Sequence, residues 1–237
     1  MMNDEMLMVF NDQQERIGTA SRKEVHEKGY WHEAFHCWFV SRENDIDYIY
    51  FQIRSEQKQD YPGALDITAA GHLLHTETAV DGVREIHEEL GVNILFDELL
   101  PLDVFKYEVS QPHYIDKEFA HIFLYYSSHP LTAFTLQQEE VSGLVKAPFS
   151  HFCELWLGNQ TELIIEGITN KKEPIHRTAY KSEFAPHPKA YYETIISFIS
   201  QQLHSAEKII YVALPSATSL PLLSSIFTSP TASVLPR

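Results

Sequence analysis

The chain has 237 residues, and its 33 acidic residues against 18 lysines and arginines give a formal net charge of −15 at pH 7. This charge disfavours non-specific binding to nucleic-acid backbones and to anionic membrane surfaces. Only two cysteines occur, so neither a disulfide framework nor a cysteine-based zinc site is indicated. Without a signal-peptide pattern or an apolar span, we expect a cytoplasmic protein whose partners include no membrane and no nucleic acid.

The first half of the chain carries the pattern of a strand, a hairpin and a helix. A short apolar run at 5–10 ends in the polar NDQQERIG and predicts an opening strand. The runs AFHCWFV (34–40) and DYIYFQI (47–53) are rich in aromatic and β-branched residues and flank a polar segment, which is typical of a hairpin. A helix is then predicted at 78–90, with a capping-type threonine at its start and Gly91 after its end.

The second half alternates strand and helix patterns. LPLDVFKYEVS (100–110) and EFAHIFLYYSS (118–128) predict strands, and EEVSGLVKAPFSHFCELW (139–156) predicts a strand that runs into a helix. Residues 186–205 have apolar residues at helical spacing. The order of elements predicts an α+β fold with layered α/β/α architecture. We expect one domain at 1–204 and a low-complexity tail or extension at 205–237.

The helix predicted at 78–90 has two chemically different sides. At 100° per residue, the apolar residues gather on one side and the glutamates on the other; they are Val80, Val83, Ile86 and Leu90, and Glu85, Glu88 and Glu89. A solvated acidic face is the common explanation of such a pattern. However, carboxylates this close also offer the oxygen ligands that Mg²⁺ or Mn²⁺ prefers, with positions left for phosphate oxygens.

The segment at 71–92 resembles the Nudix box. REIHEELGV (84–92) matches the core of that pattern, and Gly71 and Glu77 match its front half. Six residues separate Glu77 from Arg84, where the pattern has seven. A looser similarity extends over residues 30–160. The chain is therefore identified as a member of the Nudix hydrolase superfamily.

This resemblance implies a Nudix fold, with a mixed sheet sandwiched between helices. It also implies Mg²⁺- or Mn²⁺-dependent hydrolysis of a diphosphate linkage in a nucleoside diphosphate derivative or related organic diphosphate. The implied metal ligands are Glu85, Glu88, Glu89 and the carbonyl of Gly71. Arg84 would hold the glutamates, and the general base would be Glu118 or Glu85, with Glu139 and Glu140 as weaker candidates.

The segments WHEAFHCWFV and AAGH also resemble isopentenyl-diphosphate isomerase, a relative with the same fold. His32 and His72 fall on metal-binding histidines of that enzyme, and Asp116 and Glu118 fall on its acidic pair. His32, His72 and Asp116 are therefore a candidate second metal site. The isomerase has a catalytic cysteine where this chain has Ala70, so hydrolysis is preferred over isomerisation.

Four further interpretations remain open at this level. HEAFH (32–36) matches a zinc-protease pattern, which requires a helix, whereas its context predicts a strand. A non-catalytic ligand sensor with the same fold is a second alternative, and a homodimer is plausible for a fold with exposed aromatic edges. Aromatic residues could also wall the substrate site, namely Trp31, Phe35, Trp38 and Tyr61.

Overall fold

The computed structural model describes the backbone of residues 5–111 and 114–213, and side chains within these ranges through residue 204. Residues Met1–Ser200 form one compact unit, and Gln201–Arg237 form a second. The extension expected at 205–237 lies outside the described residues, apart from helical backbone that ends at Ala213. None of the helices in the described ranges is long and apolar enough to cross a membrane.

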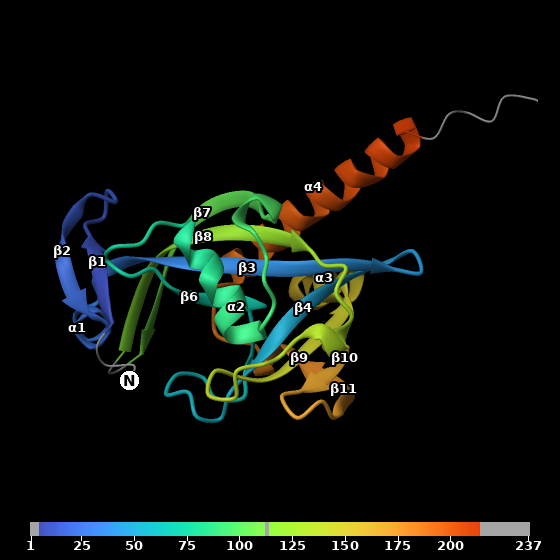
Figure 1. The fold of residues 1–237 in the computed structure, drawn as a ribbon, viewed down its shortest axis with the longest axis horizontal. Coiled ribbons are helices and arrows are strands. Elements are labelled where there is room, and N and C mark those ends of the chain that lie inside the picture. The colour runs from blue at the N-terminus through green and yellow to red at the C-terminus, as the bar shows by residue number, and fades with distance from the viewer. Residues whose placement is uncertain (1–4, 112–113, 214–237) are drawn as a thin grey trace, which may run out of the picture. The chain divides into compact units, whose positions relative to one another are not determined.

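The described strands join into one sheet with β3 at its centre (Figure 1). β3 runs parallel to β8 but antiparallel to β1, β4 and β6, so the sheet is mixed, as expected. The strands are β1 (Met6–Phe10), β2 (Arg16–Ser21), β3 (Trp31–Glu43), β4 (Ile46–Arg54), β5 (Leu65–Asp66), β6 (Ala69–His72), β7 (Leu100–Gln111), β8 (Tyr114–Tyr126), β9 (Val141–Pro148), β10 (Glu162–Thr169) and β11 (Pro174–Tyr180).

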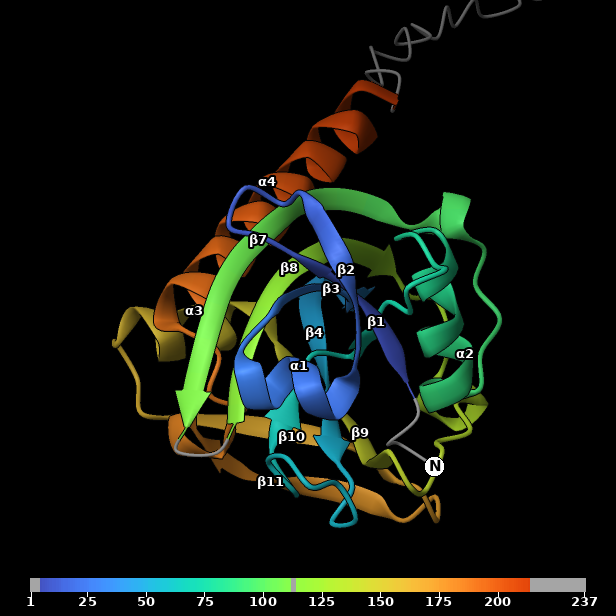
Figure 2. The ribbon, with the colours of Figure 1, turned by 90° about the vertical axis from the view of Figure 1, so that its left-hand side faces the viewer.

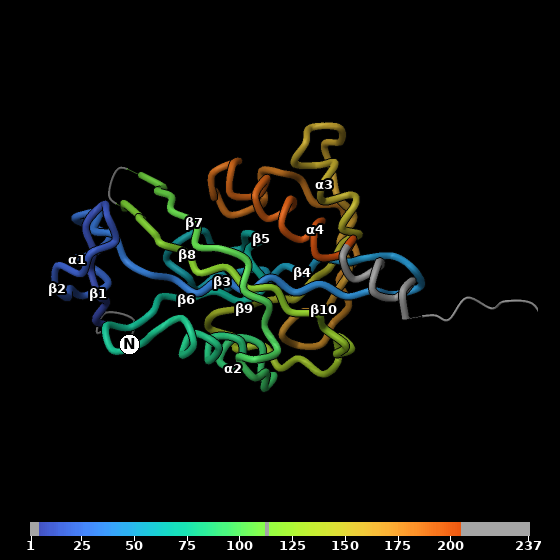
Figure 3. The backbone as a smooth tube through the Cα atoms, turned by 90° about the horizontal axis from the view of Figure 1, so that it is seen from above, coloured from blue at the N-terminus to red at the C-terminus, as the bar shows by residue number. Residues whose placement is uncertain are grey.

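Helices cover both faces of this sheet within the first unit. They are α1 (Arg22–Lys28), α2 (Arg84–Leu90), α3 (Phe149–Leu157) and α4 (Lys189–Ala213). Figure 3 shows α2 on one side of β3, and α3 with the beginning of α4 on the other. Ile86 of α2 packs in one core cluster with Phe35 and Phe39, while Trp38 packs against Phe152 and Tyr191. Because both faces are covered, β3 is buried at nearly every position from Trp31 to Ser41, and the expected layered α+β architecture is confirmed.

The helix predicted at 78–90 is shorter than expected. A 3₁₀ turn at Asp81–Val83 precedes α2, which begins at Arg84 and ends at Leu90. Gly91 follows the helix in the left-handed conformation. Gly82 lies against Phe35, since a Cβ atom at Gly82 would be 2.6 Å from that of Phe35. Val80 therefore lies outside the regular spacing and is 51% exposed, contrary to its predicted role as an anchor.

The sequence interpretation missed α1 and the β10–β11 hairpin. A local signal for α1 exists, because the hydroxyl of Ser21 caps the helix by accepting from the N–H of Glu24, and Gly29 ends it. Residues of β10 alternate between exposed and buried in the structure, but its sequence ELIIEGIT does not alternate in polarity, so it carries no clear strand signal. The strands and helices predicted at 5–10, 34–53, 100–128, 139–156 and 186–205 are all present. α4 extends eight residues beyond the predicted end of the last helix, into the segment expected as a tail.

Candidate active site

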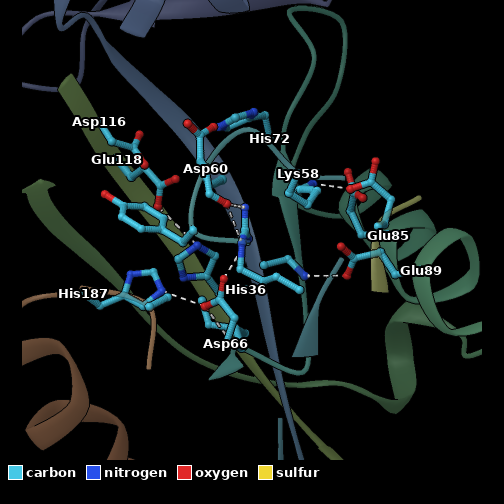
Figure 4. A pocket seen from close by; sticks show the side chains of 18 of the residues that line it. His36, Lys58, Asp60, Asp66, His72, Glu85, Glu89, Asp116, Glu118 and His187 are labelled. Carbon is cyan, nitrogen blue, oxygen red and sulfur yellow. Dashed lines mark hydrogen bonds and ion pairs between the residues drawn. The ribbon is translucent and has the colours of Figure 1, made fainter. Parts of the chain in front are cut away.

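Figure 2 shows α2 on one side of the first unit and β7 and β8 on the other. A pocket of about 240 Å³ is lined by residues of these elements. α2 contributes Glu85, Glu88 and Glu89, and β8 contributes Asp116 and Glu118. Figure 4 shows the labelled glutamates of α2 on the side of the pocket opposite the acidic pair of β8. The residues singled out in two separate parts of the sequence therefore meet in one cavity.

Arg84 ties the loop before α2 to the helix. Its Nε and Nη2 atoms donate to the two carboxylate oxygens of Glu77 at 2.7 and 2.9 Å, and Glu77 also accepts from the N–H of Leu74 at 2.8 Å. Nη1 donates to Glu85 at 2.6 Å and to Glu88 at 3.1 Å. The six-residue spacing thus still allows a bidentate contact between Glu77 and Arg84, and Arg84 contacts two of the three glutamates, Glu85 and Glu88.

The three glutamates of α2 have different environments. Glu88 is 52% exposed, whereas Glu85 is largely buried and Glu89 is 5% exposed. Glu89 accepts from Gln52 on β4 and from the N–H of Ala70 on β6, both at 3.1 Å. The acidic side of this helix is therefore not a solvated face.

Burial raises the free energy needed to ionise Glu85 and Glu89. Burial is the main cause that raises the pKa of Glu85 to about 7, with a smaller contribution from Glu88 against the attraction of Arg84. Burial and then the charge of Glu85 raise the pKa of Glu89 well above its usual range. A divalent cation between them would remove this cost by replacing the protons, so these residues fit the metal that the resemblance implies.

Gly71 on β6 lies directly against Glu85. A Cβ atom at position 71 would lie 2.2 Å from the carboxyl carbon of Glu85, so a larger residue would displace that carboxylate. Glycine at this position therefore allows the backbone of β6 and the side chain of Glu85 to share one small space.

On the opposite side of the pocket, Glu118 is buried and firmly held. Its Oε2 atom accepts from the hydroxyl of Tyr107 at 2.6 Å and lies 3.2 Å from Nε2 of His36. Burial acts to raise the pKa of Glu118, but the contact with His36 and the hydroxyl of Tyr107 outweigh it, and the pKa falls to about 2. Glu118 is thus ionised at neutral pH and faces the cavity.

The candidate second metal site gains a histidine that sequence reasoning missed. Ligand atoms of His26, His32, His72 and Asp116 all lie within 4.8 Å of one another. Nε2 of His26 and of His32 each lie 3.4 Å from Oδ1 of Asp116, yet these buried atoms make no hydrogen bond within the described residues. Burial lowers the pKa of His32 and His72, which leaves imidazole lone pairs free to bind a cation.

His26 lies on α1, the helix that the sequence interpretation missed, so its place in the cluster was missed as well. Its ring nitrogen Nδ1 contacts the carbonyl of Arg22, one helical turn earlier. The four members of this cluster come from α1, β3, β6 and β8. No local spacing in the sequence links these elements, so the pairing of β3 with both β6 and β8 is what assembles the cluster.

Basic residues that sequence reasoning did not single out also line the pocket: Arg22, Arg54 and Lys58. Arg54 donates to Asp66 at 2.8 Å, and Lys58 pairs with Glu140. Glu140 therefore lines the pocket, whereas the weaker candidate Glu139 is exposed. Arg22 also has acidic partners, Glu5 and Asp60, so carboxylates offset the charge of all three cations.

The remaining candidates of the sequence interpretation are placed as follows. HEAFH lies on β3, in the strand that its context predicts, which argues against the zinc-protease pattern. Trp31, Phe35 and Trp38 are buried core residues and form no wall of the pocket. Tyr61 does line it, and its hydroxyl accepts from Gln111 at 2.7 Å.

Comparison with known proteins assigns the chain to a family. An uncharacterised Nudix hydrolase of Clostridium acetobutylicum is 38% identical over 200 residues, which cover 82% of this chain and 97% of that protein. An isopentenyl-diphosphate Δ-isomerase of Aliivibrio fischeri is 29% identical over 143 residues, covering 59% of this chain and 78% of the isomerase.

Among solved structures, a protein of Deinococcus radiodurans matches with a TM-score of 0.49 and 20% identity, over 65% of this chain and 90% of that one. No family model matches the sequence. The similarity to the Clostridium protein extends over nearly its whole length and includes the segment with the Nudix box pattern. The chain is a member of the Nudix hydrolase family.

Proposed function

We propose that this protein is a divalent-cation-dependent hydrolase that cleaves a diphosphate linkage in a nucleoside diphosphate derivative or a related organic diphosphate. The observation that carries the proposal is the pair of buried carboxylates, Glu85 and Glu89, beside Gly71 at the edge of the pocket. Two such groups have little structural benefit without a cation, since each costs free energy to ionise where it lies.

The residues that would hold Mg²⁺ or Mn²⁺ are Glu85, Glu88, Glu89 and the carbonyl of Gly71. When bound, such a cation supplies positive charge that offsets the negative charge of the diphosphate. Arg84 keeps two of the glutamates in place through its hydrogen bonds, and Arg84 is itself fixed by Glu77.

Glu118 is the general base that we favour, and Glu85 is the alternative. Glu118 is ionised at neutral pH and faces the pocket, so it is placed to accept a proton from an attacking water, although its pKa of about 2 makes it a weak base. The pKa of Glu85, about 7, matches that of a general base better, but binding of a cation would occupy its oxygens. We further propose that the cluster of His26, His32, His72 and Asp116 holds a second divalent cation, since its ligand atoms lie within 4.8 Å of one another and three of them, Nε2 of His26, Nε2 of His32 and Oδ1 of Asp116, make no hydrogen bond within the described residues.

A second candidate function is the isomerisation of an isoprenoid diphosphate. The similarity to the Aliivibrio isomerase and the histidine cluster favour it. Against it, the side chain at position 70 is a methyl group, which can neither donate nor accept a proton, so one of the two acid–base partners of such a reaction is missing. Hydrolysis requires only one base and is therefore preferred.

The test is a screen of nucleotide sugars, dinucleotides, nucleoside triphosphates and prenyl diphosphates with Mg²⁺ or Mn²⁺, in which product masses identify the bond that breaks. We expect turnover by the wild-type protein and its loss in Glu88→Gln and Glu89→Gln. Glu162→Gln is the matched control, because Glu162 is exposed on β10 and does not line the pocket. Full activity in both site variants would refute hydrolysis by this site, and isotope exchange into isopentenyl diphosphate without phosphate release would favour isomerisation.

A further inference from the structure

A continuous line of hydrogen-bonding groups crosses the pocket from β5 to β8. Nε2 of His187 lies 2.9 Å from Oδ1 of Asp66, and its Nδ1 lies 3.1 Å from the hydroxyl of Tyr107. The same hydroxyl donates to Glu118 at 2.6 Å. Figure 4 shows His187 near Asp66, on the same side of the pocket as Glu118. None of these contacts was foreseen from the sequence, because the groups lie far apart along the chain.

The chemistry of the partners fixes the direction of each hydrogen bond. A tyrosine hydroxyl has one proton, and Tyr107 gives it to Glu118, so it must accept from Nδ1 of His187. Asp66 is an acceptor held by Arg54 and by the N–H of Ile67, so Nε2 of His187 must donate to it. His187 therefore carries protons on both ring nitrogens.

The electrostatics agree with this arrangement. Burial acts to lower the pKa of His187, but the hydrogen bond and charge of Asp66 outweigh it and raise the pKa. Burial, reinforced by Glu118, raises the pKa of Tyr107 well above its usual range, which keeps the hydroxyl a proton donor. The rings of His36 and Tyr191 also face His187, at centroid distances of 6.1 and 5.0 Å.

The segment that carries His187 is anchored at several points. The N–H of Ala185 donates to the carbonyl of Leu65 at 2.8 Å, and the carbonyl of Ala185 accepts from the N–H of His187 and from the hydroxyl of Tyr192. The segment between β11 and α4 is thus fastened to β5 and to the first turns of α4. The imidazole is held in position by the fold before any ligand binds.

We propose that His187 is a positioning residue, which, together with Asp66, aims the hydroxyl of Tyr107 at Glu118 and so fixes the carboxylate that faces the pocket. The proposal rests on the proposed hydrolysis, with Glu118 as its base. Tyr107 and His36 both contact Oε2 of Glu118. If the hydroxyl rotated away, His36 alone of these two would contact Oε2, and the carboxylate would be held less firmly.

The first experiment is a double-mutant cycle with His187→Gln and Tyr107→Phe, assayed with whichever diphosphate the wild-type protein turns over. We expect each variant to lower kcat about tenfold, the usual effect of one lost hydrogen bond to a charged group, with KM nearly unchanged. Because His187 acts through Tyr107, the double variant should lose no more than the worse single variant. His176→Gln is the control, since His176 is exposed on β11.

A double variant in which kcat falls about a hundredfold, as the product of two independent tenfold losses, would overturn the positioning role. Wild-type kcat in both single variants would overturn it as well. A wild-type protein that hydrolyses no diphosphate in the presence of metal would instead refute the proposed function.

A second experiment does not depend on turnover. In spectra of ¹⁵N-histidine-labelled protein, His187 should show two ring N–H signals at neutral pH, of which Tyr107→Phe shifts the Nδ1 signal and Asp66→Asn the Nε2 signal. A single ring N–H signal for His187 contradicts the proposal, whatever the activity measurements give.

Discussion

Replacement of Glu85 by glutamine tests two effects of its buried negative charge. Without metal the charge lowers the free energy of unfolding, and with metal it contributes to binding. The side chain of Glu85 is 12% exposed, and burial is the main cause that raises its pKa from 4.5 to about 7. Glutamine keeps the shape of the side chain and an oxygen that can accept from Arg84, but it carries no charge. A carboxyl group with a raised pKa contributes stability that is fully present below its unfolded-state pKa and is lost as the pH rises through its folded-state pKa.

The metal-free Glu85→Gln protein should therefore equal the wild type in stability near pH 4.5 and exceed it at pH 8. A pKa moved from 4.5 to about 7 corresponds to about 3 kcal/mol above pH 7, which is the upper limit of the expected gain. Urea unfolding in the presence of EDTA, at both pH values, measures the difference. With saturating Mg²⁺ at pH 8 the wild type should gain stability and the variant little. A variant less stable than the wild type at pH 8 in EDTA would refute the reasoning.

Three further changes test the geometry around this residue. Gly71→Ala places a methyl group against the carboxylate of Glu85, so Mg²⁺ should no longer raise Tm, while an unchanged circular dichroism spectrum shows that the fold persists. Arg84→Lys cannot make the two-pronged contact with Glu77 and should weaken Mg²⁺ binding about tenfold in calorimetric titration; unchanged affinity would contradict its positioning role. Ile86→Ala, at a fully buried position, should lower the free energy of unfolding by about 2–5 kcal/mol with or without Mg²⁺, and a metal-dependent loss would count against a purely packing role.

Much of the region around α2 could be predicted from sequence because its information is local. The spacing of Ile86 and Leu90 defines the buried side of a helix, and Gly91 supplies the left-handed residue that ends it. The ordered charges of the Nudix box pattern identify Glu85 and Arg84 without any knowledge of their neighbours. The start of the helix was harder to place, because Gly82 is required by its contact with Phe35 and not by helix propensity.

The sequence by itself thus determined the order of most strands, the layered architecture, the family and the acidic helix. Only the tertiary structure decided which carboxylates are buried, since the partners of Glu89 come from β4 and β6. It also brought His26 to the histidine cluster and His187 to Tyr107, contacts that span up to 80 positions of the chain in the latter case. Such contacts depend on how strands pair, and strand pairing leaves no local period in the sequence. The burial and the hydrogen bonds of the site residues could therefore not be predicted without the assembled sheet.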